Sequence, residues 1–315
     1  MRNKIEFKNG VFYNDDCLKV MPKLKDDSVN LILCDLPYGM TANKWDSVIP
    51  FEKLWSEYKR ILAPSGVVVL TSLGDFTIDL INSNRKWFRY RMVWVRNKAS
   101  GFLQSHKRPM RCFEDICVFC QNKAKYKILR TIVNGKKGAI IRKSGYIGAS
   151  YQDNINNDYL YDYHDDGSRF STDVLFCKRY AGFTSFASPF SETHPTEKPI
   201  NLGRYLVRLY TDENDIVLDN ACGSGSFLAS ASIENRKFIG IEKNPDYINM
   251  IKERIEYAEK AKQNPQGILF EPDGWKHGER YMGMINVDVV MARPVKTEKN
   301  RVGFTNEKKL LFLQK

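Results

Sequence analysis

The sequence predicts an α/β fold in which a mostly parallel β-sheet carries helices on both faces. The run from Val29 to Cys34 is almost entirely apolar, as is usual for a strand that both faces of a parallel sheet bury. Residues 215–242 have the order strand, glycine-containing loop, helix, strand, which indicates a Rossmann-like βαβ unit. Ligands of such sheets bind beyond the carboxyl ends of the strands, so we expect the functional residues there.

The first buried strand ends in the tetrad Asp35-Leu36-Pro37-Tyr38. The exocyclic amino group of a nucleobase is a poor nucleophile, because its lone pair is delocalised into the ring. Two hydrogen-bond acceptors at that nitrogen would change this. The Asp35 carboxylate can supply one, and the Leu36 carbonyl, held extended by the following proline, can supply the other. Tyr38 would then stack on the base. Taken alone, the tetrad is equally well explained as an ordinary turn after a strand.

The βαβ unit near the other end of the chain favours an adenosine cofactor. Its loop contains Gly223 and Gly225, which allow positive φ angles and a close approach of the backbone to a ligand. Glu242 follows the second strand, about 20 residues beyond the glycines, where an acidic side chain can accept from ribose hydroxyls. The loop lacks the full Gly-x-Gly-x-x-Gly spacing, so NAD fits less well. The expected elements are strand 216–218, helix 226–233 and strand 237–241.

Together these motifs resemble a known family, the S-adenosylmethionine-dependent DNA amino-methyltransferases, which modify adenine N6 or cytosine N4. The resemblance is carried by Asp-Leu-Pro-Tyr at 35–38, His-Pro-Thr-Glu-Lys-Pro at 194–199 and Asp-Asn-Ala-Cys-Gly-Ser-Gly at 219–225. The tetrad comes first and the cofactor loop last, an order similar to the circularly permuted β group of that family. The resemblance covers roughly residues 12–258, with a gap in the middle.

The resemblance implies that S-adenosyl-L-methionine is the cofactor and that the tetrad is catalytic. The implied cofactor contacts are Asp16, Cys17, Asp35, Thr196, Lys198, Asp219, Cys222, Gly223, Ser224, Gly225 and Glu242. Thr196 and Lys198 would help to hold the methionine end. Asp16 is almost as well explained as the cap of a helix. The sequence departs from the common family form at Ala221, where an aromatic residue is usual.

Charge favours a polyanionic partner, because 49 Lys and Arg residues against 37 Asp and Glu residues give a net charge of +12. A basic loop, residues 96–111, lies between strands expected at 87–95 and 115–119. Its candidate contacts to the DNA backbone are Lys98, Lys107, Arg108 and Arg111. Phe102 lies between them, where it could reach the bases. A solvated basic loop is the alternative.

Four regions are expected along the chain. Residues 1–120 would form the catalytic half of the core and residues 193–262 the cofactor-binding half. The resemblance implies that the basic and then Asn-, Asp- and Tyr-rich segment 121–192 is an inserted target-recognition region. Residues 263–315 contain no motif and are compatible with an accessory subdomain, a dimerisation arm or a further DNA contact.

The cysteines and the amino-terminal sequence indicate a cytoplasmic protein. The seven cysteines are an odd number, and the first residues show no signal peptide. Cys117 and Cys120 have a metal-ligand spacing, but they lie in a strand-like run without a second pair, so we expect no metal site. No apolar run approaches the ~20 residues of a membrane span, so no membrane partner is expected.

The motifs and the resemblance together predict methyl transfer from S-adenosylmethionine to the N6 amine of an adenine flipped out of double-stranded DNA. Asp35 favours adenine, since cytosine-N4 enzymes of the family usually carry Ser at the head of the tetrad. Cytosine-N4 methylation is the alternative, followed by an RNA or protein methyltransferase and by a DNA-binding protein without catalysis. A homodimer and a cognate restriction endonuclease are further partners that the sequence leaves open.

Overall fold

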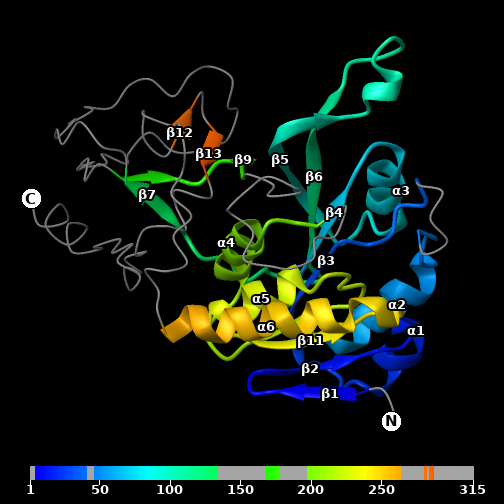
Figure 1. Ribbon diagram of the computed structural model, residues 1–315, viewed down its shortest axis with the longest axis vertical. Helices are drawn as coiled ribbons and strands as arrows, with labels where there is room; N and C mark the ends of the chain where they lie inside the picture. Colours follow the sequence, from blue (N-terminus) through cyan, green and yellow to red (C-terminus); the bar gives the residue numbers. More distant parts are fainter. Residues whose placement is uncertain are drawn as a thin grey trace, which may run out of the picture.

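A large mixed β-sheet forms the centre of the molecule (Figure 1). The computed structural model describes residues 4–40, 46–132, 168–177, 197–263, 280–281 and 284–286. The strands are β1 (Lys4–Phe7), β2 (Gly10–Tyr13), β3 (Val29–Cys34), β4 (Leu62–Ser72), β5 (Phe88–Ser100), β6 (Arg111–Phe119), β7 (Arg130–Ile132), β8 (Ser168–Phe170), β9 (Val174–Phe176), β10 (Ile216–Asp219), β11 (Lys237–Ile241), β12 (Arg280–Tyr281) and β13 (Met284–Asn286).

Eleven strands share one sheet in the order β1-β2-β11-β10-β3-β4-β6-β5-β9-β13-β12, while β7 and β8 form a separate pair. The strands β2, β11, β10, β3 and β4 are parallel to one another. β1 runs antiparallel to β2, and β6 runs antiparallel to both β4 and β5. The predicted α/β architecture with a parallel centre is confirmed.

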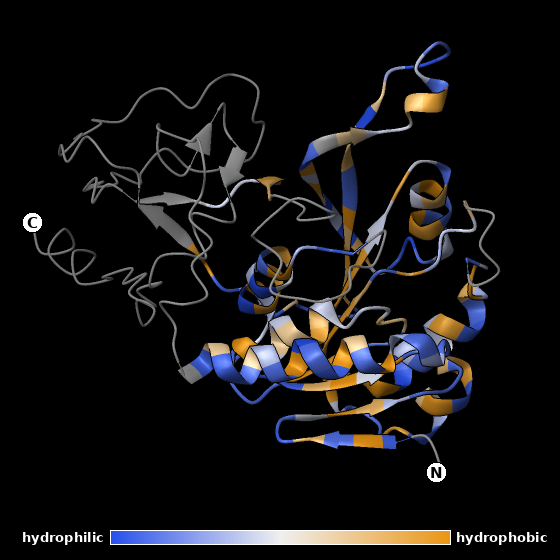
Figure 2. Ribbon diagram, in the orientation of Figure 1, coloured by the Kyte–Doolittle hydropathy of each residue, from blue (hydrophilic) through white to orange (hydrophobic). Residues whose placement is uncertain are grey.

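Helices cover both faces of this sheet. They are α1 (Cys17–Val20), α2 (Phe51–Ile61), α3 (Asp75–Ser83), α4 (Ile200–Tyr210), α5 (Ser226–Ile233) and α6 (Ile248–Gln263), with 3₁₀ turns η1 (Met21–Lys23), η2 (Phe102–Gln104) and η3 (Pro245–Tyr247). Alternate residues of β3 enter two separate cores: Leu31 packs with α4, α5 and α6, whereas Ile32 packs with α2 and α3. The apolar strands between the helices are visible in Figure 2.

Most elements lie where the sequence predicts them, including β3, α5 and β11. The strands expected at 87–95 and 115–119 are longer than predicted, because β5 continues to Ser100 and β6 begins at Arg111, so part of the expected loop 96–111 is strand. β4 begins at Leu62, directly after α2. The pairing of β3 with β4 shifts register between Val29 and Leu31. Residues 64–66 therefore form an irregular stretch within β4.

The segments expected outside the core are described only in part. Within 121–192, β9 joins the main sheet beside β5, and β13 from the carboxyl-terminal region pairs with β9. The division into four regions stays a prediction. None of the helices in the described part of the chain combines the length and the apolar content that a bilayer span requires.

Candidate active site

A cavity of about 840 Å³ opens at the carboxyl ends of β3, β10 and β11. We call it the catalytic cavity because it is the candidate active site. It brings together most of the residues that the sequence singles out, and the predicted ones in its wall are Asp16, Cys17, Asp35, Leu36, Pro37, Tyr38, Arg111, Lys198, Asp219, Cys222, Gly223, Ser224 and Glu242. Gly225 is not in the wall, and Thr196 lies outside the described residues. The tetrad and the cofactor loop therefore face one space.

Asp35 is held by three donors from three different elements. Its Oδ1 accepts hydrogen bonds from the Tyr38 hydroxyl, at 2.6 Å, and from the Thr71 hydroxyl. Its Oδ2 forms an ion pair of 2.5 Å with the Lys198 Nζ. Each carboxylate oxygen has two lone pairs, so Oδ2 retains capacity for one more donor at the cavity. The carboxylate is thus fixed in place and still able to accept.

Tyr38 has both its ring and its hydroxyl in contact with protein groups. The ring packs on Phe76 at 4.9 Å between centroids, and Lys198 lies 5.8 Å from its centre. Burial raises the pKa of the phenol well above its ordinary value, and the charge of Asp35 adds to this. The hydroxyl therefore stays protonated and donates to Asp35. The predicted stacking of Tyr38 on a base stays a prediction.

Lys198 is a buried cation between two carboxylates. Its side chain is only 5% exposed, and its Nζ lies 3.3 Å from Glu114 Oε2 in addition to the contact with Asp35. Burial lowers the pKa of this ammonium, but the two carboxylates outweigh that effect and raise it. The structure thus places Lys198 against the tetrad. Its expected contact with the methionine end of the cofactor stays a prediction.

The loop after β10 has the backbone shape that its glycines predict. Gly223 and Gly225 have φ angles of 48° and 81°. Glu242 Oε2 accepts from the Gly223 N–H at 2.9 Å, and its Oε1 accepts from the Asn244 N–H at 2.9 Å. Glu242 therefore holds the loop in place, and the remaining lone pairs of its oxygens can accept hydrogen bonds from ribose hydroxyls.

Asp219 is a buried acid at the end of β10. Burial raises the pKa of its carboxyl group to about 8, with smaller contributions from the charges of Asp35 and Glu242. The Cys34 thiol and the Ala221 N–H act in the opposite direction, but they do not compensate. Much of Asp219 is therefore protonated near neutral pH, and a cation in the cavity would favour its ionised form.

At Asp16 the structure supports both interpretations. Its Oδ1 accepts from the Leu18 N–H at 2.8 Å, so it caps α1, and it also lines the catalytic cavity. Cys17 beside it is buried, which raises the pKa of its thiol to about 11. This thiol is therefore a packing and lining group without nucleophilic character at neutral pH.

Asp46, Thr71 and Glu114 support the site but were not singled out from the sequence. Asp46 accepts from the backbone N–H groups of Gly39, at 2.8 Å, and Met40, at 2.9 Å, and so fixes the chain after the tetrad. Thr71 reaches Asp35 because β4 pairs with β3, and Glu114 reaches Lys198 from β6. The signal available for Thr71 was a polar residue directly after an apolar run, and for Glu114 it was a pair of carboxylates directly before one.

The expected basic loop is the end of the β5–β6 hairpin, which projects from the sheet (Figure 1). Lys107 and Arg108 are exposed there, while the side chain of Lys98 is not among those described. The turn η2 presents Phe102 and Leu103 to solvent, 72% and 94% exposed, beside the hydrophilic stretch that follows (Figure 2). Since Leu103 and Arg111 line the catalytic cavity, the hairpin forms part of its rim.

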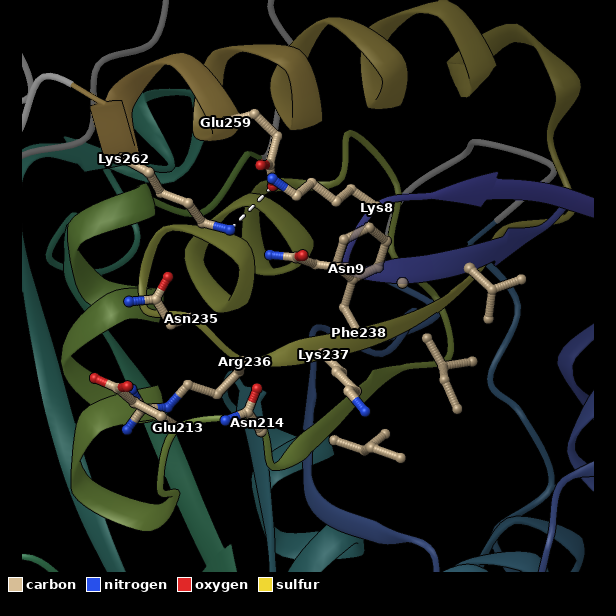
Figure 3. Close-up of a pocket in the computed structure, with 14 residues that line it drawn as sticks. Lys8, Asn9, Glu213, Asn214, Asn235, Arg236, Lys237, Phe238, Glu259 and Lys262 are labelled. Carbon is tan, nitrogen blue, oxygen red and sulfur yellow. Dashed lines mark hydrogen bonds and ion pairs between the residues drawn. The ribbon is translucent and has the colours of Figure 1, made fainter.

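A second cavity, of about 670 Å³, lies at the opposite edge of the sheet, where β10 and β11 begin (Figure 3). Two of its charged residues, Glu259 and Arg236, have close partners. Glu259 accepts from Lys262 at 3.0 Å and from the Ser232 hydroxyl at 2.7 Å. Arg236 Nε and Nη2 bind Thr211 at 2.9 and 2.7 Å. No group of three or more His, Cys, Asp or Glu residues in the described part of the chain could hold a metal ion.

Comparison with known proteins decides the family. The model of the DNA methylase family N6_N4_Mtase matches residues 29–253, which include the tetrad and the cofactor loop. The chain belongs to this family. Its similarity to the DNA adenine methyltransferase YhdJ of Escherichia coli strain K12 is 26% identity over 254 residues, covering 77% of this chain and 81% of YhdJ.

Two solved structures share the fold. The crystal structure of an M1.HpyAVI complex with SAM has a TM-score of 0.50 at 21% identity, covering 78% of this chain and 98% of that one. The cytosine-N4-specific PvuII DNA methyltransferase has a TM-score of 0.54 at 15% identity, with coverage of 81% and 92%. The predicted Rossmann-like fold is confirmed.

The family membership confirms the resemblance seen in the sequence: the chain is a DNA amino-methyltransferase, and S-adenosylmethionine is its cofactor. The residues present fit that cofactor. Glu242 and the open backbone of the glycine loop suit its ribose, and the acidic groups Asp35 and Asp219 suit the positive charge of its sulfonium.

Proposed function

We propose that the chain methylates the N6 amine of adenine in double-stranded DNA. The observation that carries the proposal is Asp35 itself: a carboxylate heads the tetrad, is oriented by three donors and lines the same cavity as the cofactor loop. The similarity to a DNA adenine methyltransferase supports adenine over cytosine.

In this proposal the protein works by positioning, and S-adenosylmethionine supplies an electrophilic methyl group on sulfur. The free lone pair of Asp35 Oδ2 accepts one N–H of the target amine, and the Leu36 carbonyl accepts the other. These contacts draw the nitrogen lone pair out of conjugation and aim it along the line of attack. Alignment of this kind accounts for several kcal/mol of a barrier, on the order of 7–11 in favourable intramolecular cases.

The target base must leave the duplex to reach the cavity, because its amine is otherwise paired and stacked. We propose that the β5–β6 hairpin contacts the DNA backbone through Lys107, Arg108 and Arg111, and through Lys98 nearer its base. The segment 121–192 would read the sequence, and residues 263–315 would be accessory. The proposed compartment is the cytoplasm, which the seven free thiols support. A cognate restriction endonuclease and a homodimer are proposed partners.

The test is transfer of labelled methyl groups from S-adenosylmethionine to mixed-sequence duplex DNA, followed by digestion to nucleosides and chromatography. Label in N6-methyladenine is the expected result. Label in N4-methylcytosine would be consistent with the proposed catalytic arrangement but would show that the target base is cytosine. Label in RNA but not in DNA would overturn the proposal. Sequencing of methylated DNA from cells that express the chain then gives the recognition site for later assays.

A further inference from the structure

Four charged side chains, three of them buried, form a continuous chain in the wall of the catalytic cavity. Arg96 Nη1 lies 3.3 Å from Glu114 Oε1, Glu114 Oε2 lies 3.3 Å from Lys198 Nζ, and Lys198 Nζ lies 2.5 Å from Asp35 Oδ2. Arg96 and Glu114 are each 7% exposed. The methyl-transfer arrangement described above uses Asp35 and its ion-pair partner Lys198, so Arg96 and Glu114 require an explanation.

Stability alone is a weak explanation for this chain. Burying an ion pair costs the hydration free energy of both charges. Their mutual attraction offsets this cost only when every polar atom is well hydrogen-bonded. Here Glu114 Oε2 and Arg96 Nε are buried without a hydrogen-bond partner, and the ion pair of Glu114 with Lys198 is long at 3.3 Å. These ion pairs are therefore better suited to setting the charge distribution around Asp35 and Lys198 than to stabilising the fold.

Glu114 occupies the central place in the chain. On one side it binds Arg96, whose Nη2 donates to the Ser100 hydroxyl and to the Arg111 carbonyl, both at 2.9 Å, across the base of the β5–β6 hairpin. On the other side it shares the Lys198 ammonium with Asp35. The base of the hairpin is thereby connected through three contacts to the catalytic carboxylate.

We propose that Glu114 is a positioning residue that divides the charge of Lys198 between two carboxylates and so preserves Asp35 as a strong acceptor for the target amine. The inference rests on the proposed function. Without the charge of Glu114, Lys198 would pair with Asp35 alone. The Asp35 carboxylate would then be more completely neutralised and would accept the amine N–H more weakly.

The same geometry predicts how pH acts on the site. The charged and titratable groups that face Lys198 are Asp35 at the end of β3, Glu114 on β6 and the Tyr38 ring, and Arg96 on β5 lies behind Glu114. Burial opposes the charge of Lys198, and two carboxylates sustain it. Loss of one carboxylate therefore lowers the pKa of Lys198, and the ammonium is lost at a lower pH.

The test variant is Glu114→Gln, which removes the charge and keeps the size. Its matched control is Asp115→Asn, a buried carboxylate on the same strand whose side chain points to the other face and contacts Thr77 and Arg91. In steady-state assays we expect Glu114→Gln to lower kcat by about tenfold or more. KM for the cofactor should stay within about twofold, and the change in kcat that accompanies loss of the Lys198 ammonium should occur at a lower pH. Glu114→Asp should recover part of kcat.

A second readout does not depend on DNA. Competitive acetylation with acetic anhydride over a range of pH, analysed by mass spectrometry, reports the pKa of Lys198. We expect that pKa to be lower in Glu114→Gln than in the wild type and unchanged in Asp115→Asn. An unchanged pKa, or a loss of kcat no larger than in the control, would overturn the inference. Absence of methyl transfer by the wild type would instead overturn the proposed function, and the acetylation result would still decide the role of Glu114.

Discussion

The catalytic cavity and the second cavity are similar in size, at about 840 and 670 Å³, but they differ in how they hold charge. In the catalytic cavity, Asp219 is buried with a raised pKa, and Lys198 is buried between two carboxylates. In the second cavity, Glu259 and Lys262 are partly exposed and paired with each other. The catalytic cavity therefore holds a buried acid and a buried cation paired with carboxylates, whereas the second cavity holds a partly exposed ion pair.

The difference shows that volume does not identify a site in this fold. The carboxyl ends of parallel strands bring Asp35, Asp219 and Glu242 together from separate parts of the chain, whereas the amino ends present surface residues that solvent and close neighbours satisfy. Shifted pKa values do not separate the two cavities either, since burial lowers the pKa of Arg236 in the second one. What distinguishes the catalytic cavity is that carboxylates from several strand ends meet a buried cation there. Equivalent substitutions at the two edges of the sheet test this difference.

The largest effect is expected for Asp35→Ala. The variant removes the side-chain acceptor for the amine, so methyl transfer should fall by about a thousandfold or more, as for other groups that stabilise developing charge directly. Affinity for S-adenosylmethionine, measured by calorimetry, should stay within about threefold. Lys198 keeps Glu114 as a partner, so the fold should persist in circular dichroism. Substantial residual transfer would show that Asp35 does not have the role assigned to it.

A pH effect is expected from Asp219. Its pKa of about 8 means that, below this pH, the carboxyl group must release a proton before it can pair with the sulfonium cation. Affinity for the cofactor should therefore rise as pH increases from about 6.5 to about 8 and level off above, by about tenfold in all. Calorimetry on Asp219→Asn should show this dependence reduced. An identical pH profile in both proteins would contradict the assignment.

A smaller effect is expected at the tip of the hairpin. Leu103→Ala removes an exposed apolar side chain at the rim of the cavity, where it can fill the space that a flipped base leaves. We expect kcat/KM on duplex DNA to fall by about tenfold, and less on DNA in which the target base is mispaired. Phe113→Ala, also exposed but on the strand of the hairpin, is the control. Equal losses on paired and mispaired DNA would exclude this role.

The smallest effect is expected for Glu259→Gln in the second cavity. The change removes a charge of the same sign as Asp35→Ala does, but at the opposite edge of the sheet. Methyl transfer should stay within about twofold, and thermal unfolding should show a cost of at most about 1 kcal/mol for a partly exposed ion pair. A loss of activity comparable with that of Asp35→Ala would mean that the second cavity also serves catalysis.

The sequence predicted what depends on local pattern. The apolar run of β3, the glycine loop and the helix after it determine their own conformations, so Asp35, Asp219 and Glu242 could be placed at strand ends in advance. The predicted set did not include Thr71 or Glu114, because they reach Asp35 and Lys198 only through the pairing of β3 with β4 and of β4 with β6. Contacts between distant strands have no short-range signature.

The strand order also has a consequence for how the chain folds. β10 and β11 are inserted between β2 and β3, although β2 and β3 are close neighbours in the sequence, ending at Tyr13 and beginning at Val29. While the chain is being synthesised, the first half of the sheet therefore has a gap that only residues 216–241 can fill. The open edges of β2 and β3 can form their native strand pairs only after this segment, in the last third of the chain, has been synthesised. Folding should be slow, dominated by long-range contacts, and most vulnerable to aggregation before that segment is made.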